Sequence, residues 1–515
     1  MPPQDLARKS LLLLGSTWGG SALGMVVSIL VGRALGPEAL GSIGFSTGIV
    51  GLVMAALLPG FAQAHLKRLG EGQDAGRCLG TMLAIQVALH GVLVAALLLV
   101  WTTQGLFASS GLALVFLFLL GAQVASNFAD VFLKVFIARE WVVAHSIIVL
   151  SARLLRLLAT VAVLAMAPGV VGVAATFGID GVAGGLAAVV VLGRRYRVTP
   201  RAPSRASLAD YWSFARPFTI TTPLALFQDS IDRVLVGAWA GLTAAGHYQI
   251  ARALWEALSS VIAAPMTFLF TRLSGLYARR SHTRDREARD FFLHGLDKLL
   301  FLTMPLAFAV WAFAETGITL LYGESFRPAA LPLRVLVLAA VAANIINPYT
   351  FVIMALDQAA RFIPVNLLRV VAYAGLLVVL VPPRPWLPGL ESLWPGELGA
   401  ALARLFLILF PCWVYFRWTR ELAGIPLYTR AWAYLGGFAV MLAAFHALLI
   451  SAGGFGLTGW AAAIPAAVAA LGLYLAYLFQ VHPATGDNLR YSLALASPIA
   501  FIRFLRGGLH GPERP

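Results

Sequence analysis

Long apolar segments of about 20 residues recur along the whole chain, separated by short segments that hold most of the charged residues. The segment Gln86–Trp101, QVALHGVLVAALLLVW, is typical, because its apolar residues run on without alternation. A helix of about 20 residues crosses about 30 Å of hydrocarbon, whereas strands of a membrane barrel alternate apolar and polar residues over about ten positions. The pattern therefore predicts an all-α membrane protein.

We place about 14 transmembrane helices on this pattern. The expected spans are residues 10–32, 40–60, 79–101, 110–136, 141–166, 170–193, 214–236, 244–270, 293–314, 329–355, 361–382, 397–416, 431–452 and 457–480. Lys and Arg gather in alternate loops, and the opposite loops 102–110, 167–170 and 451–457 contain none. Cytoplasmic loops carry an excess of Lys and Arg, so we expect both termini to be cytoplasmic in a multi-pass protein of the inner (plasma) membrane.

A short segment is repeated in the two halves of the chain. LVGRALGPEALG, Leu30–Gly41, and LVGAWAGLTAAG, Leu235–Gly246, share three glycines at matching positions. Each copy ends the first span of a six-span block, and the two blocks enter the membrane in the same orientation. This predicts two parallel six-helix lobes around a central cavity, the architecture of many transporters, with Pro37 and the glycines forming an outer turn.

The domain boundaries follow from this repeat. We expect an N-terminal six-helix lobe with a basic linker at residues 1–206 and a C-terminal six-helix lobe at 207–425. Two additional membrane helices and a cytoplasmic tail then occupy residues 426–515.

Composition narrows the function classes. Only 12% of residues are charged and 60% are hydrophobic, whereas soluble domains carry about 25% charged residues. The net charge of +15 is explained by cytoplasmic loops that meet anionic membrane lipids, and no nucleic-acid partner is expected. The two cysteines, Cys78 and Cys412, give neither a disulfide framework nor a metal spacing.

Arginines within the expected spans are the candidate substrate-binding residues. A charge at membrane depth costs about 2.5–3.5 kcal/mol on insertion scales, so it should face a cavity or a partner. In span 5, two arginines share a helix face with no acid within helical reach. The candidates are Arg153, Arg156, Arg252, Arg369 and Arg404.

Acidic residues within the spans are candidates for ion coupling, because protonation of a carboxylate at such depth can accompany a conformational change. They are Asp229, Asp232 and Glu256. The alternative is structural: Arg252–Glu256, Asp130–Lys134 and Asp229–Arg233 are each four residues apart and can neutralise one another. Coupling to Na+ or H+ needs no bound cofactor, and no catalytic or metal-binding motif is present in the sequence.

Four segments resemble one group of transporters. GRALGPEALGSIGF, DRVLVGAWAGLTAAGHYQIAR (Asp232–Arg252), LYGESFRPAALPLRVL (Leu321–Leu336) and GELGAALARLF (Gly396–Phe406) look like the corresponding segments of bacterial polysaccharide flippases. These flippases belong to the multidrug/oligosaccharidyl-lipid/polysaccharide (MOP) exporter superfamily. The resemblance spans about residues 8–480 and implies alternating access through a cationic cavity.

The resemblance also implies a substrate and partners. The expected function is translocation of a polyprenyl-diphosphate-linked oligosaccharide, a polysaccharide precursor, from the cytoplasmic to the outer leaflet by ion-coupled alternating access. Expected partners are this lipid-linked glycan, anionic membrane lipids, and the glycan polymerase or glycosyltransferases of the same pathway. The alternatives are a lipid II flippase and a cation-coupled multidrug exporter of the same superfamily, with a membrane glycan polymerase or ligase ranked lower.

Two features separate these alternatives. Lipid II flippases have arginines within spans 1 and 2, whereas here Arg33 stands at the outer end of span 1 and span 2 has none. A drug exporter for cations needs an acidic or aromatic cavity, which the arginines oppose. A polymerase or ligase needs a sizeable outer loop, and the expected outer loops are short. The role of Arg33 is left open.

Overall fold

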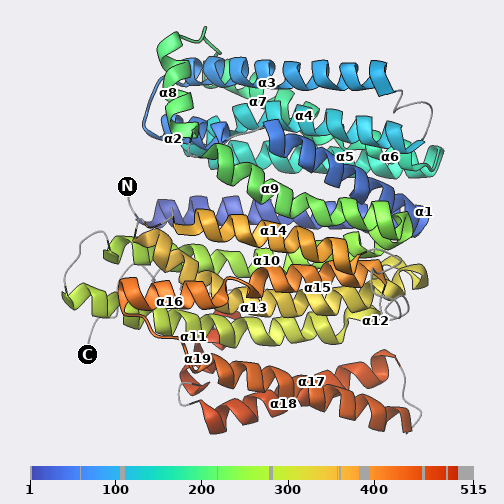
Figure 1. The fold of residues 1–515 in the computed structure, drawn as a ribbon, viewed down its shortest axis with the longest axis vertical. Coiled ribbons are helices and arrows are strands. Elements are labelled where there is room, and N and C mark those ends of the chain that lie inside the picture. Colours follow the sequence, from blue (N-terminus) through green and yellow to red (C-terminus); the bar gives the residue numbers. More distant parts are fainter. Residues whose placement is uncertain are drawn as a thin grey trace. The chain divides into compact units, whose positions relative to one another are not determined.

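The computed structural model describes residues 3–57, 60–104, 111–216, 218–277, 282–356, 358, 361–381, 395–454, 459–482 and 485–496. Throughout these residues every regular element is helical (Figure 1), as the apolar pattern predicts. The chain forms two compact units, unit 1 (Met1–Gln249) and unit 2 (Ile250–Pro515).

Unit 1 contains ten helical elements and the first turns of an eleventh. They are α1 (Pro3–Leu57), α2 (Phe61–Gly70), α3 (Ala75–Gln104), α4 (Gly111–Ala138), α5 (Val142–Met166), α6 (Val170–Thr176), α7 (Gly178–Arg194), α8 (Arg205–Ala215), α9 (Phe218–Leu235), the π-helical η1 (Val236–Ala240) and α10 (Leu242–Tyr277). Helix α10 continues into unit 2. The boundary between the compact units therefore lies within α10. Helix α9, which precedes α10, packs along α1 and belongs to unit 1. The expected lobe boundaries at 206/207 and 425/426 remain predictions.

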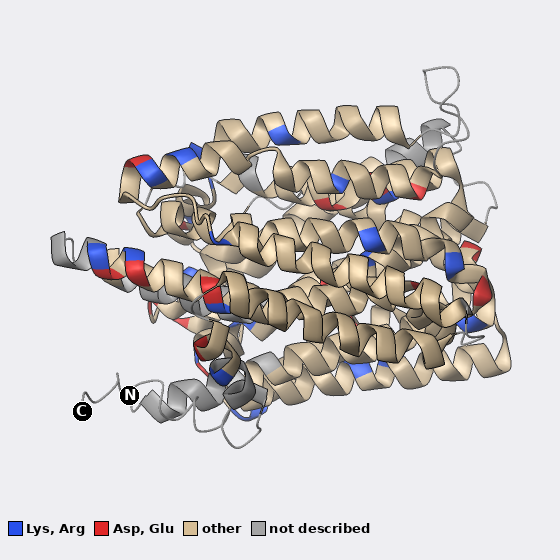
Figure 2. Cartoon of the chain, turned by 90° about the horizontal axis from the view of Figure 1, so that it is seen from below, with Lys and Arg blue, Asp and Glu red and all other residues tan. Residues whose placement is uncertain are grey.

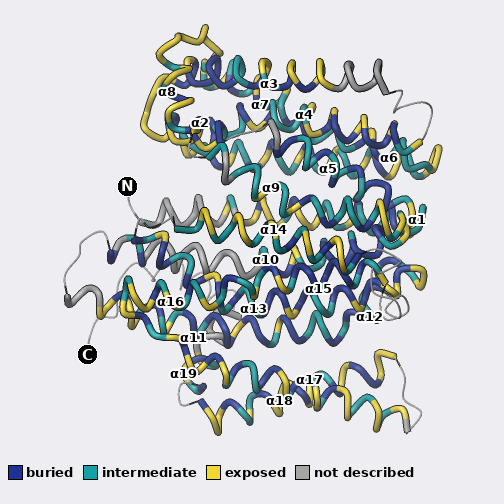
Figure 3. Tube along the Cα trace, in the orientation of Figure 1, coloured by how far each residue is buried: buried dark blue, intermediate teal, exposed yellow. Residues whose placement is uncertain are grey.

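Unit 2 contains the remaining helices. They are α11 (His282–Ala312), α12 (Ala314–Tyr322), the 3-10 helix η2 (Glu324–Ala329), α13 (Ala330–Ala355), α14 (Phe362–Leu380), α15 (Gly396–Leu409), α16 (Cys412–Ala423), α17 (Ala431–Gly454), α18 (Trp460–Val481) and α19 (Thr485–Ala496). Helix α13 is buried along most of its length, whereas α17 and α18 pack on each other and leave many residues exposed (Figure 3).

Eleven helical segments of the described chain are long and apolar enough to cross a membrane. They are Gly15–Ala55, Ala75–Ala96, Gly111–Ala138, Val142–Met166, Val170–Arg194, Arg286–Ala312, Glu324–Ala355, Phe362–Leu380, Gly396–Ala423, Ala431–Gly453 and Trp460–Val481. Charged residues are sparse along the middle of these helices (Figure 2). The chain is thus a multi-pass membrane protein, while the count of about 14 spans remains a prediction.

The first candidate span consists of two helices joined at Gly36. This residue has φ 79° and ψ −176°, so the helical path breaks there, immediately before Pro37. Gly241, its counterpart in the repeat, has φ 94° and ψ 166° and separates η1 from α10. Both conformations are open to glycine and strained for other residues. The outer turn expected from the sequence is therefore present in both copies, with the same backbone geometry.

The two copies of the repeat also contact each other reciprocally. A Cβ on Gly41 would stand 1.7 Å from the carbonyl oxygen of Leu242, and a Cβ on Gly246 would stand 2.0 Å from that of Pro37. Pro37 and Leu242 occupy equivalent positions in the repeat, as do Gly41 and Gly246. The helices can cross at backbone contact only because each copy supplies a residue without a side chain.

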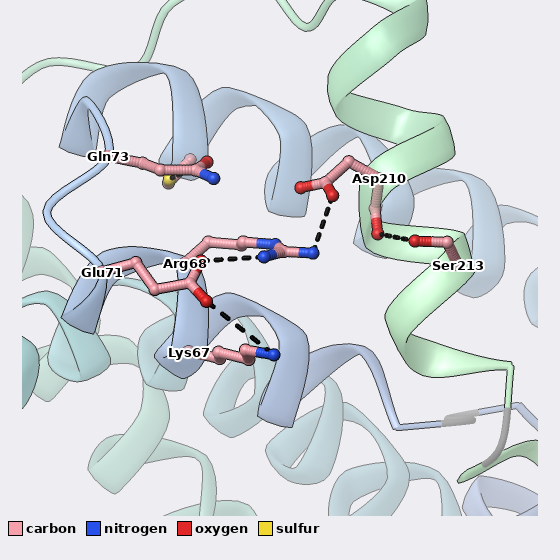
Figure 4. Close-up of polar contacts among 7 residues, drawn as sticks. Lys67, Arg68, Glu71, Gln73, Asp210 and Ser213 are labelled. Carbon is pink, nitrogen blue, oxygen red and sulfur yellow. Dashed lines mark hydrogen bonds and ion pairs between the residues drawn. The ribbon is translucent and has the colours of Figure 1, made fainter.

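Helices α2 and α8 of unit 1 are joined by polar contacts. Arg68 on α2 binds Asp210 on α8 at 2.7 Å and Glu71, the residue that follows α2, at 2.8 Å (Figure 4). The hydrogen bond from Arg68 keeps the pKa of the Glu71 carboxyl below its usual range. The N-terminus of α8 is closed by a capping box of Ser204 and Ser207.

A buried histidine joins the same two helices to α4. The Nδ1 of His65 lies 3.0 Å from the hydroxyl of Tyr211, and its Nε2 lies 3.0 Å from the carbonyl oxygen of Val131. The carbonyl is an acceptor only, so Nε2 carries the proton and Nδ1 accepts from the tyrosine. Burial, reinforced by the nearby charge of Lys134, lowers the pKa of His65 to about 4, and the bond to Val131 offsets only part of this shift.

We expect Gly41→Ala and Gly246→Ala each to destabilise the protein by about 1–3 kcal/mol, the usual cost of overpacking. The new methyl group meets a backbone carbonyl that has no room to move. The measurement is thermal unfolding in detergent. Gly121→Ala on α4 is the control, because nothing lies within 4 Å of its Cβ position. Equal melting temperatures for Gly41→Ala and wild type would contradict the reciprocal contact.

We expect stability to fall as the pH drops from about 6.5 to 4, because the unfolded state then binds a proton at His65 that the folded state refuses. At pH 5 the free energy of unfolding is about 2 kcal/mol lower than at neutral pH because of this group. His65→Gln should remove this part of the pH dependence of unfolding, and His294→Gln, at an exposed histidine on α11, should retain it. An unchanged pH profile in His65→Gln would show that another group is responsible.

Candidate functional site

Three of the predicted arginines come from helices that meet in unit 2. Arg404 on α15 is only 4% exposed, and its guanidinium lies over the rings of Trp255, at 5.7 Å, and Tyr373, at 5.3 Å. Trp255 is three residues beyond Arg252 on α10, and Tyr373 is four residues beyond Arg369 on α14. Arg404 therefore links the helices that carry the other two arginines.

Arg369 binds the same stretch of α15. Its Nε donates to the carbonyl oxygen of Leu407 at 3.1 Å, and its Nη1 donates to the Oδ1 of Asn366 at 3.1 Å. Leu407 follows Arg404 by three residues, so Arg369 and Arg404 reach neighbouring turns of one helix. We call Arg252, Arg369 and Arg404 the arginine cluster.

Arg252 is paired, as its spacing predicts. It is 3% exposed, and its Nε donates to the carboxylate of Glu256 at 2.7 Å. Glu256 keeps 47% of its side-chain surface exposed. Glu256 is therefore a structural counter-ion whose carboxylate lies partly at the protein surface.

A pocket of about 250 Å³ adjoins Arg369. Helices α13, α14, α15 and α16 supply its walls. Its lining residues are Ile346, Asn347, Thr350, Met354, Phe362, Asn366, Arg369, Ile408, Pro411 and Tyr415. The two amides, two hydroxyls and one guanidinium donate hydrogen bonds, and the pocket therefore suits phosphate or sugar oxygens. We call it the C-terminal pocket.

The arginines of span 5 have partners that the sequence analysis did not identify. Arg156 forms an ion pair with Asp180 on α7 at 2.8 Å and lies 3.6 Å over the ring of Phe177. Arg153 donates to the carbonyl oxygen of Gly20 on α1 at 2.9 Å. Helix α5 carries no acid within helical reach of Arg156, as the sequence analysis states, and the partner stands on a neighbouring helix. A partner on a neighbouring helix is invisible to helical spacing.

The two acids of α9 have different environments. Asp232 is fully buried and accepts hydrogen bonds from the hydroxyl of Tyr248 at 2.6 Å and from the backbone N–H of Arg233 at 2.9 Å. Asp229 is exposed. The pairing of Asp229 with Arg233 remains a prediction. The pairing of Asp130 with Lys134 on α4 is confirmed.

The predicted residues thus fall into two sets. In unit 2, Arg404 contacts Trp255 on the helix of Arg252 and Glu256, and Tyr373 on the helix of Arg369. In unit 1, Arg153 and Arg156 on α5 have their own partners, separate from those of Asp232 on α9. Among the residues the structure describes, no group of three or more His, Cys, Asp and Glu side chains is arranged to hold a metal ion.

A buried carboxylate in unit 2 was missed by the sequence analysis. Asp297 on α11 is 5% exposed and accepts hydrogen bonds from the hydroxyls of Tyr428 and Tyr434 and from the amide of Asn488. The Nε2 of His482 lies 2.9 Å from the same carboxylate. An acid inside an expected span was the only available signal, because its partners lie 131 to 191 residues further along the chain.

This contact set, which we call the Asp297 node, ties the C-terminal helices to α11. Tyr434 lies in the first turn of α17, His482 follows the last residue of α18, and Asn488 lies on α19. Burial lowers the pKa of His482, with a further contribution from Arg430, although Asp297 opposes the shift. Burial, together with the bond to Asp297, raises the pKa of Tyr428, so its hydroxyl remains a donor.

Comparison with known proteins identifies the class of fold. Residues 6–276, more than half of the chain, match the model of a family described as Polysaccharide biosynthesis protein. None of the curated proteins matches the chain. The lipid II flippase MurJ in an inward closed conformation is similar in structure, with a TM-score of 0.69 at 12% identity over 91% of this chain and 99% of that chain.

Two further structures have the same fold. An inward-facing multidrug resistance MATE family transporter of the MOP superfamily gives a TM-score of 0.58 at 17% identity, covering 79% of this chain and 94% of that one. A MOP superfamily transporter from Pyrococcus furiosus, described as having a binding pocket of reverse polarity, gives 0.56 at 16% identity over 82% and 96%. At such identities the likeness shows the fold alone, and it is the fold of MOP superfamily transporters.

We expect Asp297→Ala to destabilise unit 2 by about 3–5 kcal/mol, the cost of leaving the partners of a buried charge unpaired. The terminal helices should become accessible to protease before the rest of the chain. Limited proteolysis and thermal unfolding measure the two effects. Asp290→Ala, at an exposed acid on the same helix, is the control. Unchanged protection of α17–α19 would rule out the anchoring role.

Proposed function

Because the chain belongs to the Polysaccharide biosynthesis protein family and has the fold of MOP superfamily transporters, we propose that it is a lipid-linked glycan flippase. It moves a polyprenyl-diphosphate-linked oligosaccharide from the cytoplasmic to the outer leaflet by alternating access. The observation that carries the proposal is the arginine cluster beside the C-terminal pocket.

The diphosphate is the part of this substrate that hydrocarbon excludes most strongly. Guanidinium groups bind phosphate oxygens with charge-assisted hydrogen bonds in a bidentate geometry. The guanidinium of Arg404 lies over aromatic rings of α10 and α14, and Arg369 donates to a backbone carbonyl oxygen of α15. We assign the diphosphate to these two residues, with Arg252 as the third cationic group.

The C-terminal pocket supports the same assignment by its size and chemistry. Its volume of about 250 Å³ is below the usual range of about 300–1,000 Å³ for small-molecule sites. It therefore suits one diphosphate or one sugar ring rather than a whole oligosaccharide. Asn347, Asn366 and Thr350 supply neutral hydrogen-bonding groups next to the Arg369 charge.

The remaining predicted residues take secondary roles in the proposal. Arg153 and Arg156 line the N-terminal part of the path, with Asp180 moderating the charge of Arg156. Coupling to H+ or Na+ is assigned to Asp229 and Glu256, which are exposed. Asp232 is closed off by Tyr248 and takes part only if that hydrogen bond opens.

The competing functions fit the residues less well. A multidrug exporter for cations shares the fold, but the Arg404 guanidinium occupies the faces of Trp255 and Tyr373 that would attract a cationic drug. A lipid II flippase shares the fold of MurJ, yet of the first two expected spans here, span 1 has only Arg33 at its outer end and span 2 has no arginine. A glycan polymerase or ligase needs a catalytic constellation on an outer loop, for which the described residues offer no support.

The proposal places the protein in the plasma membrane with both termini in the cytoplasm. The pathway's glycosyltransferases supply its substrate and a glycan polymerase consumes its product. Anionic lipids meet its basic loops.

We expect Arg369→Ala and Arg404→Ala each to lower transport of a polyprenyl-diphosphate-linked glycan by about 10- to 100-fold, the value of a hydrogen bond to a charged group. The assay follows outward movement of the labelled lipid in proteoliposomes. Arg369→Lys should recover only part of the rate, because lysine keeps the charge and loses the forked geometry.

Arg417→Ala is the matched control for these variants. Arg417 lies on α16, is 68% exposed, and pairs with Glu421, so its loss should leave transport unchanged. Wild-type transport in Arg369→Ala and Arg404→Ala, at equal protein levels, would overturn the assignment of the diphosphate to the arginine cluster.

A further inference from the structure

Helix α4 carries a polar stripe inside an otherwise apolar candidate span. Gln123, Asn127, Asp130 and Lys134 are spaced by four, three and four residues. Residues with this spacing lie on one face of a helix. The span that contains them, Gly111–Ala138, meets the length and hydropathy of a membrane crossing. The stripe is therefore a continuous line of polar groups at membrane depth in unit 1.

The members of the stripe hold one another in place. The Nε2 of Gln123 donates to the Oδ1 of Asn127 at 2.9 Å, and Lys134 forms an ion pair with Asp130. Each contact joins residues one turn apart. The stripe consequently carries no net charge, in contrast to the arginine cluster of unit 2, although it is rich in hydrogen-bonding atoms.

Helix α3 extends this polar surface with two buried side chains. The Nε2 of His90 lies 3.3 Å from the amide nitrogen of Asn127, and its Nδ1 lies 2.8 Å from the backbone carbonyl oxygen of Gln86. Gln86 is 4% exposed, and its side-chain Oε1 has no hydrogen-bond partner. A buried carbonyl left unpaired costs about 1–3 kcal/mol, so this atom is available to a ligand or water that enters.

A small pocket lies between these groups. Its volume is about 70 Å³, and Gln86, Asn127, Asp130 and Lys134 contribute its polar walls. Asp130 also keeps 54% of its side-chain surface exposed, and Gln123 is exposed. Exposed amide and carboxylate groups are not stable against hydrocarbon, where each loses its hydrogen bonds with water. The stripe therefore faces water or a polar ligand rather than lipid tails.

We infer that the stripe and Gln86 form a sugar-binding wall for the glycan part of the substrate, an inference that rests on the proposed function. Sugar hydroxyls both donate and accept hydrogen bonds, and amides and a neutralised carboxylate match them in both respects. A site of no net charge selects uncharged sugar residues over acidic ones. The stripe of unit 1 thereby recognises the sugar.

The test compares two probes that differ only in the sugar, undecaprenyl diphosphate and undecaprenyl diphosphate linked to N-acetylglucosamine. Binding of each to the purified full-length protein is titrated by native mass spectrometry. We expect Gln123→Ala and Asn127→Ala to weaken binding of the sugar-bearing probe by about 3- to 10-fold, as neutral hydrogen bonds do. Binding of the sugarless probe should stay within about twofold of wild type.

Two control variants make the result specific. Leu117→Ala changes an exposed apolar residue on the same helix, away from the stripe, and should leave both affinities unchanged. Arg404→Ala should weaken both probes alike. Thermal unfolding of each variant shows that the helix is intact, and the isosteric Gln123→Leu repeats the test without a loss of side-chain volume.

The outcomes separate the inference from the proposed function. Equal affinities of the two probes in wild type, or equal losses for both probes in the stripe variants, overturn the sugar-binding wall and leave the flippase proposal standing. Unchanged binding of both probes with an altered pH dependence of transport overturns it in favour of a proton path through Asp130 and Lys134. No binding of either probe to wild type overturns the proposed function, and the inference with it.

Discussion

A charged side chain inside hydrocarbon needs a partner, and in this protein several such partners stand on another helix. Arg156 on α5 finds Asp180 on α7, and Arg404 on α15 finds the rings of α10 and α14. Apolar helices in lipid gain little from merely touching, because the surrounding lipid tails are equally apolar. Interhelical polar contacts therefore specify which helices pack together.

Close backbone approach is the second means by which these helices recognise one another. The reciprocal contact of Gly41 and Gly246 needs no charge, and it places the two copies of a repeated turn against each other. The positive φ angles of Gly36 and Gly241 direct the chain into that contact. The two copies of the repeat thus have similar geometry. In each copy one glycine forms the bend, and a second glycine leaves room for the backbone of the other copy.

Sequence patterns predicted those features that depend on residues close together in the chain. The long apolar segments predicted a helical membrane protein, and the repeat predicted turns that contain Gly36 and Gly241. The four-residue spacing predicted the ion pairs Asp130–Lys134 and Arg252–Glu256. Partners from distant segments were not predictable, because periodicity assigns a residue to a face without naming the neighbouring helix. Asp180 was therefore missed as the partner of Arg156, and all four side chains around Asp297 were missed as well.

The order of synthesis gives the Asp297 node a further significance. Asp297 leaves the ribosome 191 residues before Asn488, which corresponds to about 10 to 40 s of translation at ordinary rates. During that interval α11 must enter the bilayer with a carboxylate whose final donors do not yet exist. During this time the Asp297 carboxylate must be hydrated, protonated or bound by a chaperone. Synthesis of α19 then closes the node, so helices made later finish the assembly of one inserted much earlier.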